Sequence, residues 1–77
     1  MTGHEGDKVG SRWLEILDRV RMLRLSEHEM TFEQRSFLID TEARLVRYQT
    51  NTALTVRQRN WITHIEAEFL EQRRAPL

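Results

Sequence analysis

The chain has 77 residues, with 12 basic and 12 acidic side chains and a formal net charge of zero. This length allows one small domain and leaves no room for a large enclosed active site together with the core that would hold it. The balanced charge disfavours a domain built mainly to bind a nucleic-acid backbone, and the absence of cysteine excludes disulfides, thiolate metal sites and cysteine nucleophiles.

The first ten residues contain all three glycines of the chain and lack the basic start and apolar run of a secretory signal. Nowhere does an apolar run reach the length of a membrane helix. We expect residues 1–10 to form a flexible leader, residues 11–75 to form a single helical domain, and the protein to be cytoplasmic, without a membrane segment.

Residues 11–75 contain neither glycine nor proline and are rich in strong helix formers. The sequence therefore predicts an all-α fold, a small three-helix domain with helices near residues 11–25, 32–50 and 56–74. The connections between these segments have lengths typical of antiparallel neighbours.

The first predicted helix has Ser11 as a candidate N-cap. Its apolar residues recur at helical spacing and predict a buried stripe of Trp13, Ile16, Leu17, Val20 and Leu23. Leu14, Met22 and Leu25 lie off this stripe, so the helix is apolar on more than one side. We expect Trp13 to pack against Trp61 and so to join the first helix to the third.

The second predicted helix opens with a capping box formed by Thr31 and Gln34. It has two apolar stripes on nearly opposite sides, one made of Phe37, Leu38, Thr41, Leu45 and Tyr48 and the other of Phe32, Ile39, Ala43 and Val46. Because an ordinary surface helix has one stripe, this pattern predicts a helix covered on both sides, either by the other two helices or by a partner chain.

The third predicted helix repeats the capping box with Thr55 and Gln58, and Arg73, Arg74 and Pro76 indicate its end. Its apolar face consists of Trp61, Ile62, Ile65 and Phe69. Residues 31–45 align without gaps to residues 55–69, with identical Thr, Gln, Arg, Glu and Ala. This repeat indicates either a duplicated helical unit or a shared template of capping and burial.

Motifs for catalysis and metal binding are missing from the sequence. Beyond residue 10 glycine is absent, which excludes a Gly-x-Ser-x-Gly elbow and a glycine-rich phosphate loop there. The three histidines, His4, His28 and His64, do not form a zinc motif. The sequence thus predicts a non-enzymatic protein without a metal or cofactor.

A surplus of apolar residues beside many arginines favours a protein-interaction module. The predicted partner-binding residues are the second stripe and the arginines beside it: Phe32, Ile39, Arg44, Val46 and Arg47. The partner is expected to be a larger protein, and pairing of two copies across a two-fold axis is a second way to bury the stripe.

The alternative is a DNA-binding helix-turn-helix, in which the third helix presents Arg57, Arg59 and Asn60. These side-chain types contact bases and phosphates. Glu66, Glu68 and Glu71 oppose this interpretation because they place negative charge on the same helix.

Residues 54–65 read Leu-Thr-Val-Arg-Gln-Arg-Asn-Trp-Ile-Thr-His-Ile. This segment resembles the Leu-Thr-x-x-Gln-x-x-Trp-Leu-x-x-Ile helix of small bacteriophage and mobile-element accessory proteins, with Ile62 in place of Leu. The resemblance implies a phage or prophage protein of the anti-CRISPR or host-takeover type, which inhibits or modulates a larger host complex by occupying its surface.

Overall fold

A computed structural model describes the backbone of residues 7–74 and the side chains of residues 7–69. Its three α-helices are α1 (Trp13–Arg24), α2 (Phe32–Tyr48) and α3 (Val56–Arg74). The all-α, three-helix prediction is confirmed, although α1 and α2 are shorter than predicted. Four residues considered above lie outside the described side chains: His4, Arg73, Arg74 and Pro76.

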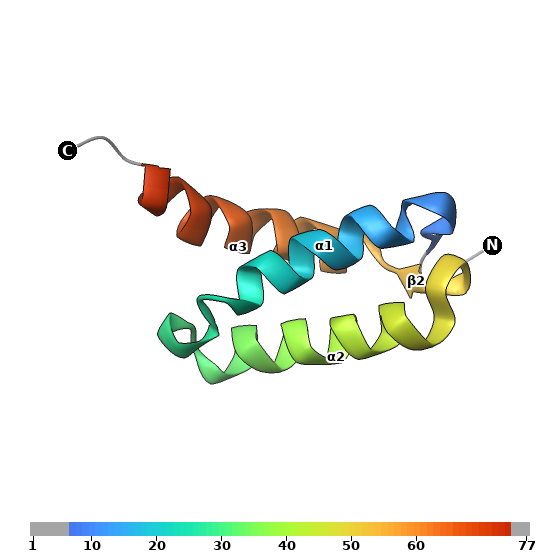
Figure 1. Cartoon of the computed structure of the whole chain (residues 1–77), viewed down its shortest axis with the longest axis horizontal. Helices are drawn as coiled ribbons and strands as arrows, with labels where there is room; N and C mark the ends of the chain where they lie inside the picture. The colour runs from blue at the N-terminus through green and yellow to red at the C-terminus, as the bar shows by residue number, and fades with distance from the viewer. Residues whose placement is uncertain (1–6, 75–77) are drawn as a thin grey trace.

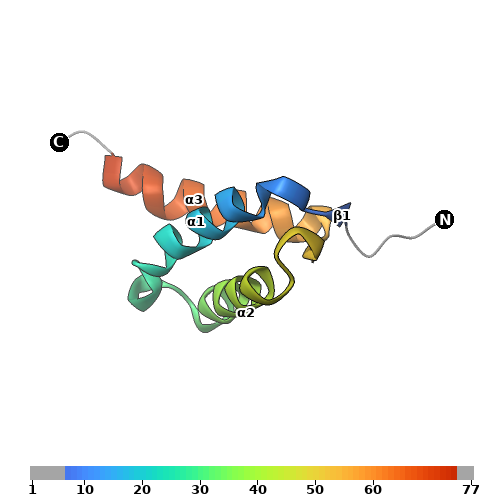
Figure 2. The ribbon, with the colours of Figure 1, turned by 45° about the vertical axis from the view of Figure 1, so that its right-hand side comes forward.

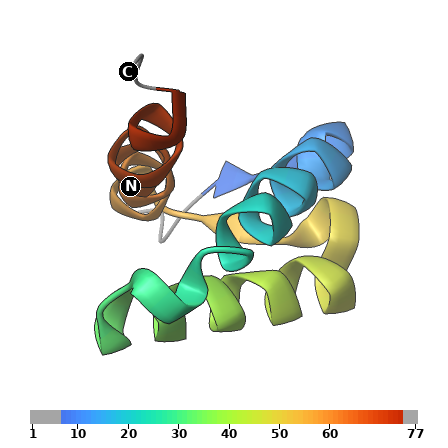
Figure 3. The same ribbon diagram turned by 60° about the vertical axis from the view of Figure 1, so that its left-hand side comes forward.

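A single turn of 3₁₀ helix precedes α1, one follows α1 and one follows α2, and a short β-ribbon joins the segment before α1 to the segment before α3. The turns span Gly10–Arg12, Glu27–Glu29 and Gln49–Asn51, and the ribbon pairs β1 (Asp7–Lys8) with β2 (Ala53–Leu54). Helix α1 packs against both other helices, and α2 runs back along it (Figure 1). Two rotated views show α1 and α3 in the upper part of the molecule and α2 beneath them (Figures 2 and 3).

The core lies where the three helices meet, and it is made of aliphatic side chains with one phenylalanine. Helix α1 supplies the predicted stripe, with Trp13 half-buried at its start. The predicted faces of α2 and α3 are also the ones that turn inward, apart from Tyr48, which is exposed. The buried hydrophobic residues are Val9, Ile16, Leu17, Val20, Leu23, Met30, Leu38, Leu45, Leu54, Ile62, Ile65 and Phe69.

The N-terminal boundary of the domain differs from the prediction. Residues 7–10 were expected to belong to a flexible leader, but Asp7 pairs with Leu54 and Lys8 with Ala53 in an antiparallel ribbon. Val9 is buried in the core, and its backbone N–H donates to the carbonyl of Thr52 at 2.8 Å. Gly10 then adopts a φ of +61°, a conformation that favours glycine, and turns the chain into α1. The ordered domain therefore includes residues 7–10.

The predicted capping boxes are confirmed at α2 and α3. In each, the threonine hydroxyl accepts from the glutamine backbone N–H, and the glutamine side chain accepts from the threonine N–H, at 2.8 to 3.1 Å. The predicted Ser11 cap is wrong, because Ser11 lies inside a 3₁₀ turn. Arg12 occupies the N-cap of α1 and makes no capping hydrogen bond with its side chain.

The two repeated segments occupy equivalent environments as well as sharing their caps. Phe37 and Trp61, which correspond in the repeat, stack on each other with ring centroids 4.4 Å apart. Trp61 therefore joins α3 to α2, and the expected partnership with Trp13 is replaced by this stack. Glu42 and Glu66 also correspond, and each forms ion pairs with arginines of α1.

Candidate protein-interaction surface

The second apolar stripe of α2 is exposed on the outside of the molecule. At about 100° per residue, Phe32, Ile39, Ala43 and Val46 fall within about 60° of one another, on the side opposite the buried residues of α2. Phe32 is 73% exposed, Ile39 43% and Val46 47%. Among the described residues, neither α1 nor α3 covers this stripe. We call the surface of these four residues the outer face of α2.

The two arginines predicted beside this stripe are also exposed. The Nε atom of Arg44 lies 3.3 Å from a carboxylate oxygen of Asp40, one helical turn earlier. The guanidinium of Arg47 lies over the ring of Tyr48, 5.5 Å from its centroid. Helical spacing places Arg47 closer than Arg44 to the stripe. Both cations are therefore held at the surface, and Arg47 is the better placed to contact a partner on the outer face.

Charge is ordered along this edge of α2. The acidic residues Glu33 and Asp40 precede the basic residues Arg44 and Arg47, and all four are exposed. A partner helix that lies antiparallel across the outer face would meet acidic side chains of α2 along one half of its length and basic side chains along the other half. This order was visible in the sequence, but it became meaningful only when the structure showed that the face is uncovered.

The residues of the DNA-binding alternative do not share one face of α3. Arg57 and Asn60 are exposed, whereas Arg59 is partly buried and lines a cavity beside α1. Positions two apart on a helix differ by about 200° around its axis, which accounts for the separation of Arg57 from Arg59. Thr55 and Gln58 are already engaged in the capping box. Of the three residues proposed to contact DNA, the start of α3 therefore presents only Arg57 and Asn60 on one exposed side.

Ion pairs between neighbouring helices hold the domain together. Arg19 of α1 donates from Nε and Nη2 to the two carboxylate oxygens of Glu66 at 2.8 and 2.7 Å, and this bidentate bond raises the pKa of Arg19. Glu42 of α2 accepts from Arg24 and, at 3.0 Å, from Arg21. The hydrogen bond from Arg24, followed by that from Arg21, lowers the pKa of Glu42. These contacts tie α1 to both neighbours.

The described part of the chain also bears on metal binding and on membrane insertion. It contains no group of three or more His, Asp or Glu side chains placed to hold a metal ion. His28 contacts the adjacent Glu29 at 3.4 Å on the surface. Among the described helices, none combines the length and apolar character that crossing a membrane requires.

Comparisons with protein families, with curated proteins and with solved structures find no match to this chain. The fold itself defines the chain as a small all-α domain.

Proposed function

We propose that this protein is a non-enzymatic interaction module that binds a larger protein through the outer face of α2. The observation that supports this function is the exposure of Phe32, Ile39 and Val46 on one side of a helix whose other side is fully used by the core. Contiguous apolar surface on a small domain is typical of a binding site for another protein. Trp61, an aromatic residue of the kind that often anchors interfaces, is instead packed against Phe37 and half-buried.

The partner segment that best fits this face is an amphipathic helix. Such a helix places an apolar stripe against Ile39 and Val46, and its carboxylates can pair with Arg47 and Arg44 at the rim. If the partner helix lies antiparallel to α2, its basic residues would meet Glu33 and Asp40. A second copy of α2 has this charge order, so weak self-association through the same face is expected to compete with the larger partner.

The role follows from the resemblance of residues 54–65 to phage accessory proteins. On this proposal the protein occupies a surface of a host complex and blocks or modulates it without performing chemistry. The arginines at the rim would select a partner with complementary carboxylates, and the apolar stripe would supply most of the affinity.

The experiment that tests this proposal compares two charge substitutions of the same kind. Ile39→Glu places a carboxylate in the outer face, and Val56→Glu places one at an exposed site at the start of α3. Both should keep the helical content and the melting temperature of the wild type. Affinity capture from the native host should recover a protein with the wild type and with Val56→Glu, and lose it with Ile39→Glu. Equal recovery with all three proteins would contradict the proposed site.

Self-association is tested by sedimentation equilibrium over a wide range of protein concentration. We expect the wild type to show a reversible monomer–dimer equilibrium, and Ile39→Glu to sediment as a monomer of 9.3 kDa. Dimerisation that persists in Ile39→Glu would show that two copies meet through another surface.

A further inference from the structure

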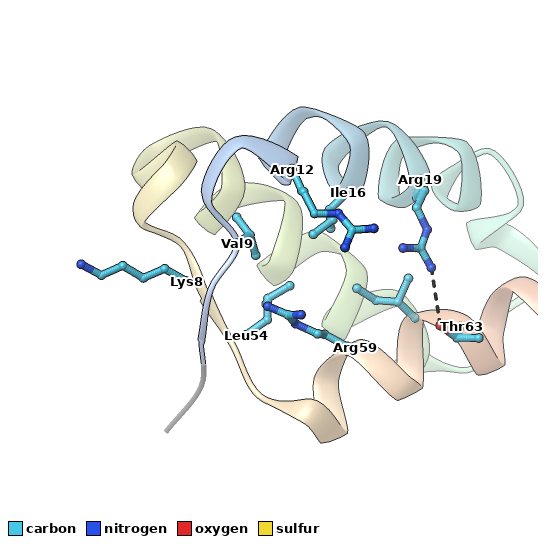
Figure 4. Close-up of a pocket in the computed structure, with 9 residues that line it drawn as sticks. Lys8, Val9, Arg12, Ile16, Arg19, Leu54, Arg59 and Thr63 are labelled. Carbon is cyan, nitrogen blue, oxygen red and sulfur yellow. Dashed lines mark hydrogen bonds between the residues drawn. The ribbon is translucent and has the colours of Figure 1, made fainter. Parts of the chain in front are cut away.

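A cavity of about 200 Å³ lies between the start of α1, the β-ribbon and the first turns of α3. Its apolar wall is formed by residues of the core: Val9, Ile16, Leu54 and Ile62. Among the described residues, every charged side chain that lines it is basic. Figure 4 shows the guanidinium groups of Arg12, Arg19 and Arg59 gathered around the cavity, whereas Lys8 points away from it.

Arg59 is the least satisfied of these cations. Its Nε atom is buried and has no hydrogen-bond acceptor among the described residues. Its Nη2 atom reaches the backbone carbonyl of Asp7 only at 3.4 Å. A buried donor without a partner destabilises a protein, and more so when it is charged. Nε and Nη2 form the side-on edge of the guanidinium, which can bind two oxygens of one anion.

Arg12 and Arg19 differ in how much of their charge is already compensated. Both carboxylate oxygens of Glu66 are bound to Arg19, which fixes the position of Arg19 and leaves it little capacity for a further anion. Arg12 makes one contact with Glu15 at 3.3 Å, and the two side chains are 70% and 60% exposed. Such an exposed pair contributes little stability and can be exchanged for another anion.

We propose that this cavity binds a compact organic oxyanion, a carboxylate or phosphate group attached to a small apolar body. Arg59 anchors the anion through its guanidinium group, and Arg12 supplies the second positive charge from the rim. The apolar body packs against Ile16 and Ile62. The cavity is smaller than the roughly 300–1,000 Å³ of pockets for drug-sized ligands, which restricts the ligand to a small acid. This site is independent of the outer face of α2.

The test follows the Nε–H resonance of Arg59 by nuclear magnetic resonance during titration of the ¹⁵N-labelled full chain. Benzoate and phenyl phosphate are the probes, and inorganic phosphate and benzyl alcohol separate the anion from the apolar body. We expect a saturable shift of this resonance with at least one of the two probes, with a Kd of about 1 mM or tighter. Both control compounds should bind at least tenfold more weakly.

Two results of the titration would overturn the proposal. The first is the absence of a saturable shift with either probe up to about 10 mM. The second is equal affinity for a probe and for one of the control compounds, because the site would then lack either its apolar wall or its anion anchor.

Matched substitutions on α3 separate a binding role of Arg59 from a structural one. Arg59→Met should weaken binding of the probe at least tenfold without lowering the melting temperature, since it removes a buried unpaired donor. Arg57→Met, on the exposed side of the same helix, should bind as the wild type does. If Arg59→Met does not fold, Arg12→Met provides the test at an exposed position, with an expected severalfold loss. Unchanged binding in a folded Arg59→Met or in Arg12→Met would refute the assignment.

Discussion

Glu42 connects α2 to two arginines of α1, and its replacement by glutamine tests how much this junction stabilises the domain. The side chain of Glu42 is 18% exposed, and it accepts from Arg24 and Arg21. A hydrogen bond to a charged group contributes about 1.5–3 kcal/mol when it is shielded, and an exposed ion pair contributes less than about 1 kcal/mol. Because Arg21 is mostly exposed and Arg24 only partly so, we expect Glu42→Gln to lower the free energy of unfolding by about 1–2 kcal/mol at pH 7.

The effect of Glu42→Gln should depend on pH in a direction fixed by the pKa of Glu42. This pKa is lower in the folded state than its ordinary value of 4.5, chiefly because of the hydrogen bond from Arg24. The folded protein therefore favours the ionised carboxylate, and the stabilisation is complete above the ordinary value. It is lost as the pH falls through the lowered folded value. The difference between wild type and Glu42→Gln should accordingly shrink at about pH 3.

Urea denaturation followed by circular dichroism measures both effects. Glu15→Gln is the matched control, because Glu15 also pairs with an arginine, Arg12 at the N-cap of α1, but lies in the solvent. We expect this control to change stability by less than about 0.5 kcal/mol at either pH. A Glu42→Gln variant as stable as Glu15→Gln at pH 7, or one whose deficit does not change on acidification, would refute the reasoning.

Three further substitutions test the fold by the same measurement. Trp61→Ala should cost about 2–3 kcal/mol, less than the 3–5 kcal/mol of a fully buried tryptophan, because Trp61 is half-buried and stacked on Phe37; a stability equal to wild type would remove it from the core. Thr55→Ala should cost about 1 kcal/mol through loss of the α3 cap, and no change would argue against the capping box. Val9→Ala should cost about 1.5–2 kcal/mol, whereas a negligible cost would place residues 7–10 outside the folded domain.

The three helices could be predicted because each has a signal that is local in the sequence. Thr31 and Thr55 begin α2 and α3 with capping boxes that need only residues three apart. The buried faces follow from apolar spacing within each helix. The start of α1 was less well predicted, because Ser11 resembles an N-cap and the local sequence does not reveal the 3₁₀ turn.

The features that the sequence did not predict depend on contacts between distant segments. The β-ribbon consists of two residues on each side, too few for an alternating pattern, and its strands are far apart in the sequence, since Lys8 pairs with Ala53, 45 positions later. The stack of Phe37 on Trp61 required knowledge of how α3 crosses α2. Likewise, Arg59 was recognised as a functional candidate, but its place beside Arg12 and Arg19 depends on the packing of α3 against α1.

For the outer face of α2, the residues could be identified from the sequence, but their exposure could not. The two stripes of α2 were evident from spacing, and both were compatible with burial inside a three-helix domain. The structure shows that α1 and α3 use only the stripe containing Leu38 and Leu45. Phe32, Ile39 and Val46, already predicted to bind a partner, are therefore accessible for an intermolecular contact.

Photo-crosslinking from the outer face of α2 tests the central claim most directly. The residue p-benzoylphenylalanine is placed at position 39 instead of Ile39 and, as a control, at position 56 instead of Val56, and each protein is irradiated in the native host. The proposed function predicts a covalent adduct with a larger host protein from position 39 and none from position 56, whereas self-association would add an adduct of twice the 9.3 kDa chain mass. Irradiation that yields no adduct from position 39, or the same adducts from both positions, would contradict it.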